Sequence, residues 1–250
     1  MSIELDRRAV LTAGIATGLA GALSSTAHAA AANATLVPLP KPESPVTVAI
    51  MMDEGATMID FAGPWEAFQD ARVAKVPGFE LYTVAPSKEP IHTTGNGHGA
   101  ARPGMRVIPD FTFADAPQPK VVIMGAQSRA DMPEKIEWIK KVAPACDIVM
   151  SVCTGAFLLA RTGLIDGLSA TTHHDYYESF ERTFKDRRIT LLKDRRFVDN
   201  GKFITAGGLT SGVDGALHVV ARYYGVEAAR VSAAYMEHNG EGWLSGMRHA

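Results

Sequence analysis

Short apolar runs alternate with amphipathic segments along most of the chain. The runs VTVAIMM, FELYTVA, VVIMG and DIVMSV have the length and composition of buried parallel strands, and they predict strands at 46–52, 79–85, 121–125 and 147–152. The longer segments between them predict helices at 64–72, 136–142, 154–161, 176–184, 213–224 and 227–238. Pro64 is expected in the first turn of its helix, where a missing N–H costs least.

A second group of strand signals lies between the predicted helices 176–184 and 213–224. ITLLKD, RFVD and KFITA form a β region, preceded by the strand-like ATT at 170–172. The sequence Asp199-Asn200-Gly201 predicts a hairpin with a type I′ turn. Strands that alternate with helices predict a mostly parallel sheet covered on both faces, which is a flavodoxin-like or Rossmann-like α/β three-layer sandwich.

The N-terminal segment is expected to be removed from the mature protein. Arg7 and Arg8 precede an uncharged run that ends at Ala27-His28-Ala29, a small-x-small cleavage pattern, so residues 1–29 are interpreted as a twin-arginine-type signal peptide. The alternative is a stable membrane anchor, but Gly, Ser and Thr dilute the apolar run. We expect a periplasmic protein with a proline-rich leader at 30–45 and one domain at 46–240.

Composition describes an ordinary globular protein. The chain is 46% hydrophobic and 21% charged, and its formal net charge of −2 gives no electrostatic reason to expect nucleic acid as a partner. Its two cysteines, Cys146 and Cys153, flank a predicted strand. At ~3.3 Å per residue they lie about 20 Å apart, whereas a disulfide allows roughly 7 Å, so we expect no intramolecular bridge. Cys146 is expected to pack as a small apolar side chain.

Cys153 is the strongest candidate for chemistry, because SVCTG places it between a buried strand and a helix. In open parallel sheets, ligands bind at the carboxyl ends of the strands. The N-terminal end of a helix favours thiolate, so the pKa of Cys153 is expected to be lowered. Thr154 offers a hydroxyl or a helix cap, and Gly155 gives room for the backbone to approach a ligand. The alternative is an inert buried cysteine.

Three motifs together resemble one protein family. SVCTGAFLLARTGLIDGLSATTHH, ITAGGLTSGVDGAL and MIDFAGPWEAF resemble the ThiJ/PfpI superfamily of class I glutamine amidotransferase-like proteins, and within it the isonitrile hydratase branch. The resemblance implies that Cys153 is a nucleophile on an elbow, that Asp60 approaches it from the loop after the first strand, and that Thr154 completes the site. Beside a thiolate, Asp60 would tend to keep its proton and act as a general acid. Without the resemblance, Asp60 could equally cap a helix.

The resemblance also places the substrate-binding residues. The superfamily commonly has Pro-Gly-Gly where this chain has Met124, Gly125, Ala126 and Gln127. We therefore expect Gly125, Ala126 and Gln127 to line the pocket, with an added Cβ at Ala126 and an added polar side chain at Gln127. His173 would contact substrate or orient water; the alternative is a structural histidine with His174 on the surface.

No metal and no cofactor are expected, because neither the His173-His174-Asp175 run nor the separated His92 and His98 has a convincing ligand spacing. The glycine-rich TTGNGHG lacks the lysine and the strand-to-helix context of a phosphate-binding loop. Some regulators join this fold to a DNA-binding domain, but this chain ends soon after its last predicted helix and carries an export signal, so no nucleic-acid partner is expected.

Three functions remain open at this point. The first is an isonitrile hydratase-like lyase that converts a small isonitrile to an N-substituted formamide through a thioimidate on Cys153. The second is a cysteine hydrolase or aldehyde-processing enzyme with the same elbow. The third is a non-catalytic redox-sensing or ligand-binding protein. The resemblance further implies a homodimer.

Overall fold

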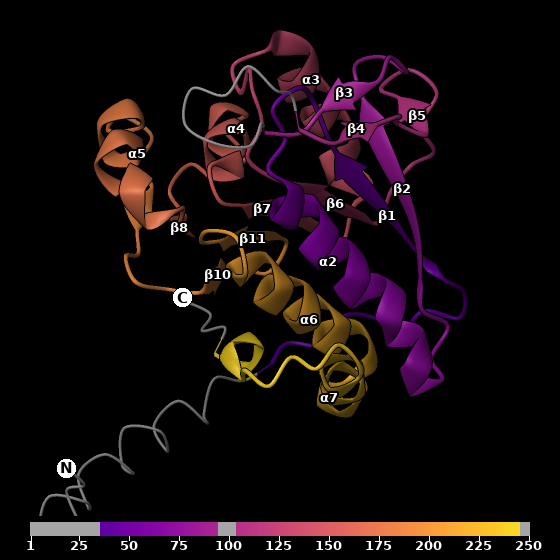
Figure 1. Ribbon diagram of the computed structural model, residues 1–250. Helices are drawn as coiled ribbons and strands as arrows, with labels where there is room; N and C mark the ends of the chain where they lie inside the picture. The colour runs from indigo at the N-terminus through magenta and orange to yellow at the C-terminus, as the bar shows by residue number, and fades with distance from the viewer. Residues whose placement is uncertain (1–35, 95–103, 246–250) are drawn as a thin grey trace, which may run out of the picture. The chain divides into compact units, whose positions relative to one another are not determined.

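The computed structural model describes residues 36–94 and 104–245, and its centre is a seven-stranded sheet (Figure 1). The strand order is β10-β11-β7-β6-β1-β2-β5, and every neighbouring pair is parallel except β10 with β11. The strands are β1 (Val46–Met51), β2 (Phe79–Ala85), β5 (Phe111–Thr112), β6 (Val121–Met124), β7 (Ile148–Val152), β10 (Phe197–Asp199) and β11 (Phe203–Ala206). Two small sheets pair β3 (Ile91–His92) with β4 (Arg106–Val107) and β8 (Ser169–Ala170) with β9 (Thr190–Leu191).

Helices cover both faces of the sheet. Alternate residues of β1 pack into two different hydrophobic cores. In the first core, Val48 and Ile50 pack with α2 (Met58–Asp70), α6 (Ser211–Tyr224) and α7 (Val226–Tyr235). Ala49 and Met51 pack with α3 (Pro133–Val142), α4 (Gly155–Arg161) and α5 (Tyr177–Thr183). Side chains alternate along a strand, so a strand that is apolar at every position must be buried on both faces. The expected three-layer α/β sandwich is confirmed.

Helix α2 begins six residues earlier than predicted. It starts at Met58, so Pro64 lies inside the helix and not in its first turn. A proline within a helix removes one hydrogen bond, a cost that packing can offset. The packing is close, since a Cβ at Gly63 would lie 2.9 Å from Val213 of α6. The burial of α2 against α6 therefore decides where the helix begins. The preference of proline for the first turn of a helix is a local signal and does not include this packing.

The short strands also differ from the predictions. Of the strand-like segment 170–172, only Ala170 is in a strand, and of ITLLKD only Thr190 and Leu191 are. The hairpin between β10 and β11 is confirmed, but of its turn residues only Gly201 has a positive φ, of 91°. A type I′ turn needs two such residues, so the predicted turn type was wrong.

The described end of the proline-rich leader is bound to α6. The backbone N–H of Leu39 donates to the Arg222 carbonyl at 2.7 Å, and the Arg222 Nε donates to the Val37 carbonyl at 3.0 Å. The expected signal peptide at 1–29, the first leader residues and His98 lie outside the described residues. None of the described helices is long and apolar enough to cross a bilayer.

Candidate functional site

Cys153 stands on a strained turn at the carboxyl end of the sheet. It follows β7, precedes α4 and has a φ of 58°. Few non-glycine residues adopt this left-handed conformation, and it persists only where the surroundings enforce it. Here the Cys153 N–H donates to the carbonyls of Ala206 (3.2 Å) and Gly207 (2.8 Å), and the Thr172 hydroxyl donates to the Cys153 carbonyl at 2.9 Å. The predicted elbow is therefore present, and the end of the neighbouring strand β11 holds it in place.

Asp60 lies beside this thiol, but on a helix. It is the third residue of α2 and is fully buried, whereas the sequence placed it in a loop. Its Oδ2 accepts a hydrogen bond from the Ala126 N–H at 2.9 Å, so the carboxylate is held by the turn after β6. The alternative interpretation as a helix cap was wrong, because α2 starts after Thr57 and no side chain caps it.

The turn after β6 holds Asp60 in place, and its Ala126 N–H is used for this purpose and not for binding a ligand. A Cβ at Gly125 would lie 2.6 Å from the Cβ of Asp60, so glycine is needed for the approach of the two segments. The Ala126 N–H is engaged by Asp60, and the Ala126 carbonyl accepts from the Thr57 N–H at 2.9 Å. Gln127 Oε1 is buried without a hydrogen-bond partner among the described residues.

The substitution Gly125→Ala tests this close approach. The added methyl group must displace Asp60 from its present position, because real Cβ contacts essentially never come under 3.0 Å. We expect a loss of about 1–3 kcal/mol in the free energy of unfolding, measured by urea denaturation, together with loss of any Cys153-dependent turnover. Gly240→Ala is the matched control, since its Cβ would meet His238 only at 3.4 Å. Equal effects of the two substitutions would contradict the role given to Gly125.

The pKa of Cys153 is raised, not lowered. The side chain is 6% exposed, and burial raises the pKa of the thiol to about 12, with the Asp60 carboxylate as the next cause. The backbone N–H groups of Thr154 and Leu209 act in the opposite direction, but they do not outweigh burial. The prediction of a depressed pKa was wrong because it counted the helix end and left out desolvation, which disfavours the charged form.

The pKa of Asp60 is raised to about 6. The direction agrees with the expectation, but the main cause is burial and not repulsion by a thiolate. The Ala126 N–H, the Cys153 thiol and the Leu209 N–H lower it. The site therefore pairs a neutral thiol with a carboxyl group that titrates near neutral pH, an arrangement suited to proton transfer between them.

Thr154 and Gly155 act through their backbones. Thr154 precedes α4 but its side chain makes no capping hydrogen bond, so its contribution to the site is the N–H that faces the Cys153 sulfur. A Cβ at Gly155 would lie 2.2 Å from the Met124 carbonyl oxygen. The absence of a side chain at Gly155 therefore allows the end of β6 to pack closely against it. The sequence had suggested that this glycine makes room for a ligand.

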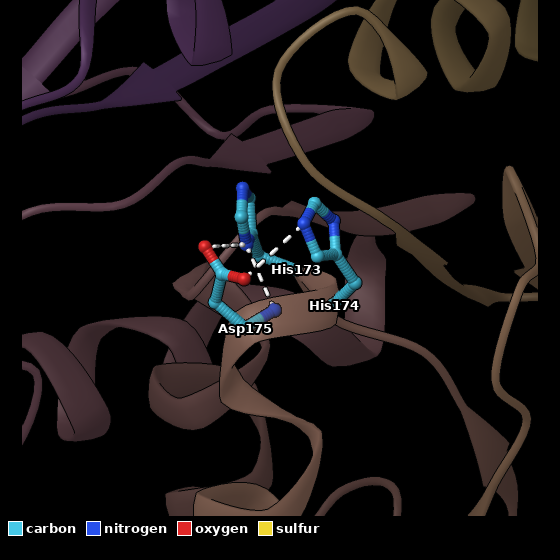
Figure 2. A group of neighbouring side chains, drawn as sticks. All are labelled: His173, His174 and Asp175. Atoms are coloured by element: carbon cyan, nitrogen blue, oxygen red, sulfur yellow. Dashed lines mark hydrogen bonds and ion pairs between the residues drawn. The ribbon is translucent and has the colours of Figure 1, made fainter.

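His173 lines a pocket that is formed in part by the β11–α6 loop. The pocket, of about 520 Å³, is lined by residues 172–174, 177, 194–196 and 207–211. The His173 ring packs against Gly208, where a Cβ would be 2.2 Å from its Cδ2, and its Nδ1 accepts from the Asp175 N–H at 3.2 Å. The His174 side chain is 71% exposed, as expected from the alternative in which His173 is structural and His174 lies on the surface. Figure 2 shows the two stacked rings and the carboxylate of Asp175 directed toward them.

One part of the site and one residue that anchors the turn after β6 were missed from the sequence. Leu209, with a φ of 52°, presents its N–H to both Cys153 and Asp60. Lys135 is fully buried and donates to Asp53 (2.8 Å) and to the Ser128 carbonyl (2.6 Å), which anchors the turn after β6. The glycine pair before Leu209 follows a strand-like segment and was a usable signal; nothing in the sequence pattern marks Lys135.

Cys146 is buried and takes no part in the candidate site. It is 3% exposed, its thiol donates to the carbonyls of Pro119 and Val142 at 3.3 Å, and burial raises its pKa to about 12. Both cysteines are free, which confirms the expectation that they do not form a disulfide.

A cysteine on a strained strand-to-helix turn, with a buried carboxyl group beside it at the carboxyl end of a parallel sheet, defines an α/β protein with a nucleophile elbow. The chain belongs to the DJ-1/PfpI family, whose model matches residues 46–222. The resemblance found in the three sequence motifs is thereby confirmed.

Individual relatives differ in what they do. The chain is 27% identical over 184 residues to isonitrile hydratase from Pseudomonas putida, covering 72% of this chain and 73% of that protein. It is 28% identical over 204 residues to the HTH-type transcriptional regulator GbdR from Pseudomonas aeruginosa, covering 79% of this chain and 51% of the regulator, so the chain spans about half that relative's length. A ThiJ/PfpI family protein from Pseudomonas syringae shares the fold, with a TM-score of 0.66, 22% identity and coverage of 83% and 85%.

Proposed function

We propose that this protein is an isonitrile hydratase-like lyase that adds water to a small isonitrile, R–N≡C, and releases the formamide R–NH–CHO. The observation that carries the proposal is the buried pairing of the Cys153 thiol with the Asp60 carboxyl group. Addition of a thiol to an isonitrile moves one proton from sulfur to the terminal carbon, so it needs a group that accepts and returns a proton. The similarity to the Pseudomonas putida isonitrile hydratase supports the choice of substrate class.

The first step forms the carbon–sulfur bond. At pH 7 a carboxyl group with a pKa of about 6 is mostly ionised, while a thiol with a pKa of about 12 is neutral. Asp60 takes the thiol proton as the Cys153 sulfur attacks the terminal carbon, and it returns that proton to the same carbon. The product is the thioimidate R–N=CH–S–Cys153, a covalent intermediate that forms without a resting thiolate.

The second step consumes water. The ionised Asp60 takes one proton from water as the oxygen attacks the thioimidate carbon, and it passes that proton to the imine nitrogen, which gives the adduct R–NH–CH(OH)–S–Cys153. Collapse of this adduct breaks the carbon–sulfur bond, releases R–NH–CHO and moves the hydroxyl proton, by way of Asp60, to the Cys153 sulfur. One isonitrile and one water give one formamide, and the enzyme ends in its starting state.

The other enzyme class is less well supported by the geometry. Cysteine hydrolases commonly use a thiolate that is activated by a histidine. The groups that shift the pKa of Cys153 are Asp60 and the N–H groups of Thr154 and Leu209, with no histidine among them.

Redox sensing is disfavoured by the raised pKa and the 6% exposure of Cys153, since sulfenic acid forms on exposed thiolates.

Ligand binding without turnover is the second candidate. The transcriptional regulator that matches 79% of this chain favours it, as does the neutral resting state of the thiol. The two candidates differ in what happens at Cys153. Only the enzyme forms a carbon–sulfur bond.

The deciding experiment exposes the protein to small alkyl and aryl isonitriles and follows two signals. Intact mass spectrometry with peptide mapping is expected to find an adduct of the isonitrile mass on Cys153, and NMR is expected to find the matching formamide. Amides and glyoxals serve as comparison substrates. Binding of an isonitrile without adduct or formamide would move the assignment to the ligand-binding candidate.

We also propose a periplasmic location and a homodimer, both on sequence grounds. The first rests on Arg7, Arg8 and the Ala27-His28-Ala29 pattern, and the second on the family resemblance. Cell fractionation with N-terminal sequencing tests the location, and sedimentation tests the dimer. A cytoplasmic form with an intact N-terminus would contradict the periplasmic location, and a monomer would contradict the homodimer.

A further inference from the structure

The donor atoms of three consecutive residues, His173, His174 and Asp175, lie within 4.8 Å of one another. His174 Nε2 is 3.2 Å from Asp175 Oδ1, and His173 Nδ1 is 3.7 Å from Asp175 Oδ2. Metal–ligand bonds of about 2.0–2.1 Å in a tetrahedral site place neighbouring ligand atoms roughly 3.3–3.4 Å apart. The two observed separations lie on either side of that value. They involve different oxygens of Asp175, and the two imidazole rings are stacked, so metal binding would require one ring to turn until both nitrogens point at the same ion.

We propose that His173, His174 and Asp175 bind one divalent transition-metal ion of the Zn²⁺ type, at the edge of the pocket beside the β11–α6 loop. Two imidazoles and one carboxylate suit borderline ions such as Zn²⁺, Co²⁺ and Ni²⁺ better than the hard ions Mg²⁺ and Ca²⁺. The proposal departs from the expectation of no metal, which considered only the spacing along the chain. It is independent of the isonitrile reaction.

The local structure holds one ligand in advance. The His173 side chain is 16% exposed, its ring lies against Gly208, and it stacks on His174 with ring centroids 4.4 Å apart. Its Nδ1 accepts from the Asp175 N–H, so this nitrogen carries the lone pair that a metal needs. Binding would replace that one hydrogen bond.

The other two ligands already form an ion pair on the surface. The side chains of His174 and Asp175 are 71% and 69% exposed, and Figure 2 shows the carboxylate beside the two rings, with a dashed line to each. His173 and His174 also line the 520 Å³ pocket, so positions not filled by protein ligands would face solvent or a ligand. Three protein ligands with an open position is the arrangement of exchangeable sites, in contrast to closed structural ones.

The test uses the full chain, purified without a polyhistidine tag. Zn²⁺ binding is measured by calorimetry, and Co²⁺ binding by the visible absorption of the bound ion. The variants are His174→Gln and Asp175→Asn, both at exposed positions. The matched control is His92→Gln, because His92 Nδ1 and Glu54 form a similar pair at 3.2 Å that belongs to no three-residue cluster within the described part of the chain.

We expect one equivalent to bind to the unmodified protein and to His92→Gln with equal affinity. Loss of an outer-shell partner alone commonly costs about 10- to 100-fold in affinity, so loss of a ligand in His174→Gln or Asp175→Asn should cost roughly 100-fold or more. Metal should also raise the Tm of the unmodified protein but not of these two variants. Absence of binding, binding that survives both substitutions, or binding that Cys153→Ala abolishes would each overturn the proposal.

Discussion

Cys153→Ala is expected to abolish both the covalent adduct and formamide production. Removing the nucleophile of a covalent enzyme costs on the order of a millionfold in turnover, because no neighbouring group replaces the attacking atom. In the described structure the other cysteine, Cys146, is buried against the carbonyls of Pro119 and Val142 and has no access to this role. Turnover is measured by formamide release, and the adduct by intact mass.

Cys146→Ala is the control for this prediction. It removes a buried thiol of the same size but leaves the site untouched, so it is expected to lower stability without removing turnover. A Cys153→Ala protein that folds and still converts isonitriles would show that the elbow does not carry the reaction.

Asp60→Asn is expected to lower turnover by roughly 10²- to 10⁴-fold, the range for a lost general acid or base. The mechanism needs the ionised carboxylate, so kcat/KM of the unmodified protein should rise with pH through about 6 and be lost below it. The amide cannot titrate, so this limb should be absent from the pH profile of the variant. A variant that folds normally and keeps full turnover would reduce Asp60 to a structural role.

The same variant should make the Cys153 thiol more acidic. The Asp60 carboxylate raises the pKa of Cys153, so its removal should speed alkylation of Cys153 at pH 9, by about tenfold for each unit of pKa lowered. Asp60 is not among the causes of the raised pKa of Cys146, so alkylation of Cys146 should not change. Equal acceleration at both cysteines would indicate general loosening of the fold.

Folding stability should follow the pKa of Asp60 as well. Its folded-state pKa of about 6 lies above the ordinary value of 3.8, so the folded protein binds this proton more tightly than the unfolded chain does. The stabilising contribution is therefore full below about pH 4 and is lost as pH rises to 6, up to about 3 kcal/mol. Urea denaturation across this range should show the change in the unmodified protein and not in Asp60→Asn.

The sequence by itself determined the layers of the fold and the position of the nucleophile. Four apolar runs became the strands β1, β2, β6 and β7 within a residue or so, because a strand buried on both faces must be apolar throughout. SVCTG placed Cys153 between β7 and α4 for the same reason, since the apolar run ends where the strand leaves the core. The family also followed from sequence, because its motifs are local.

Only the tertiary structure decided what surrounds Cys153. The start of α2 at Met58, which moves Asp60 from a loop into a helix, depends on packing against α6. The raised pKa of Cys153 depends on burial by segments distant in sequence. The use of the Ala126 N–H by Asp60 joins residues 66 positions apart. Desolvation and hydrogen bonding between distant segments are properties of assembled layers, and no local pattern in the chain encodes them.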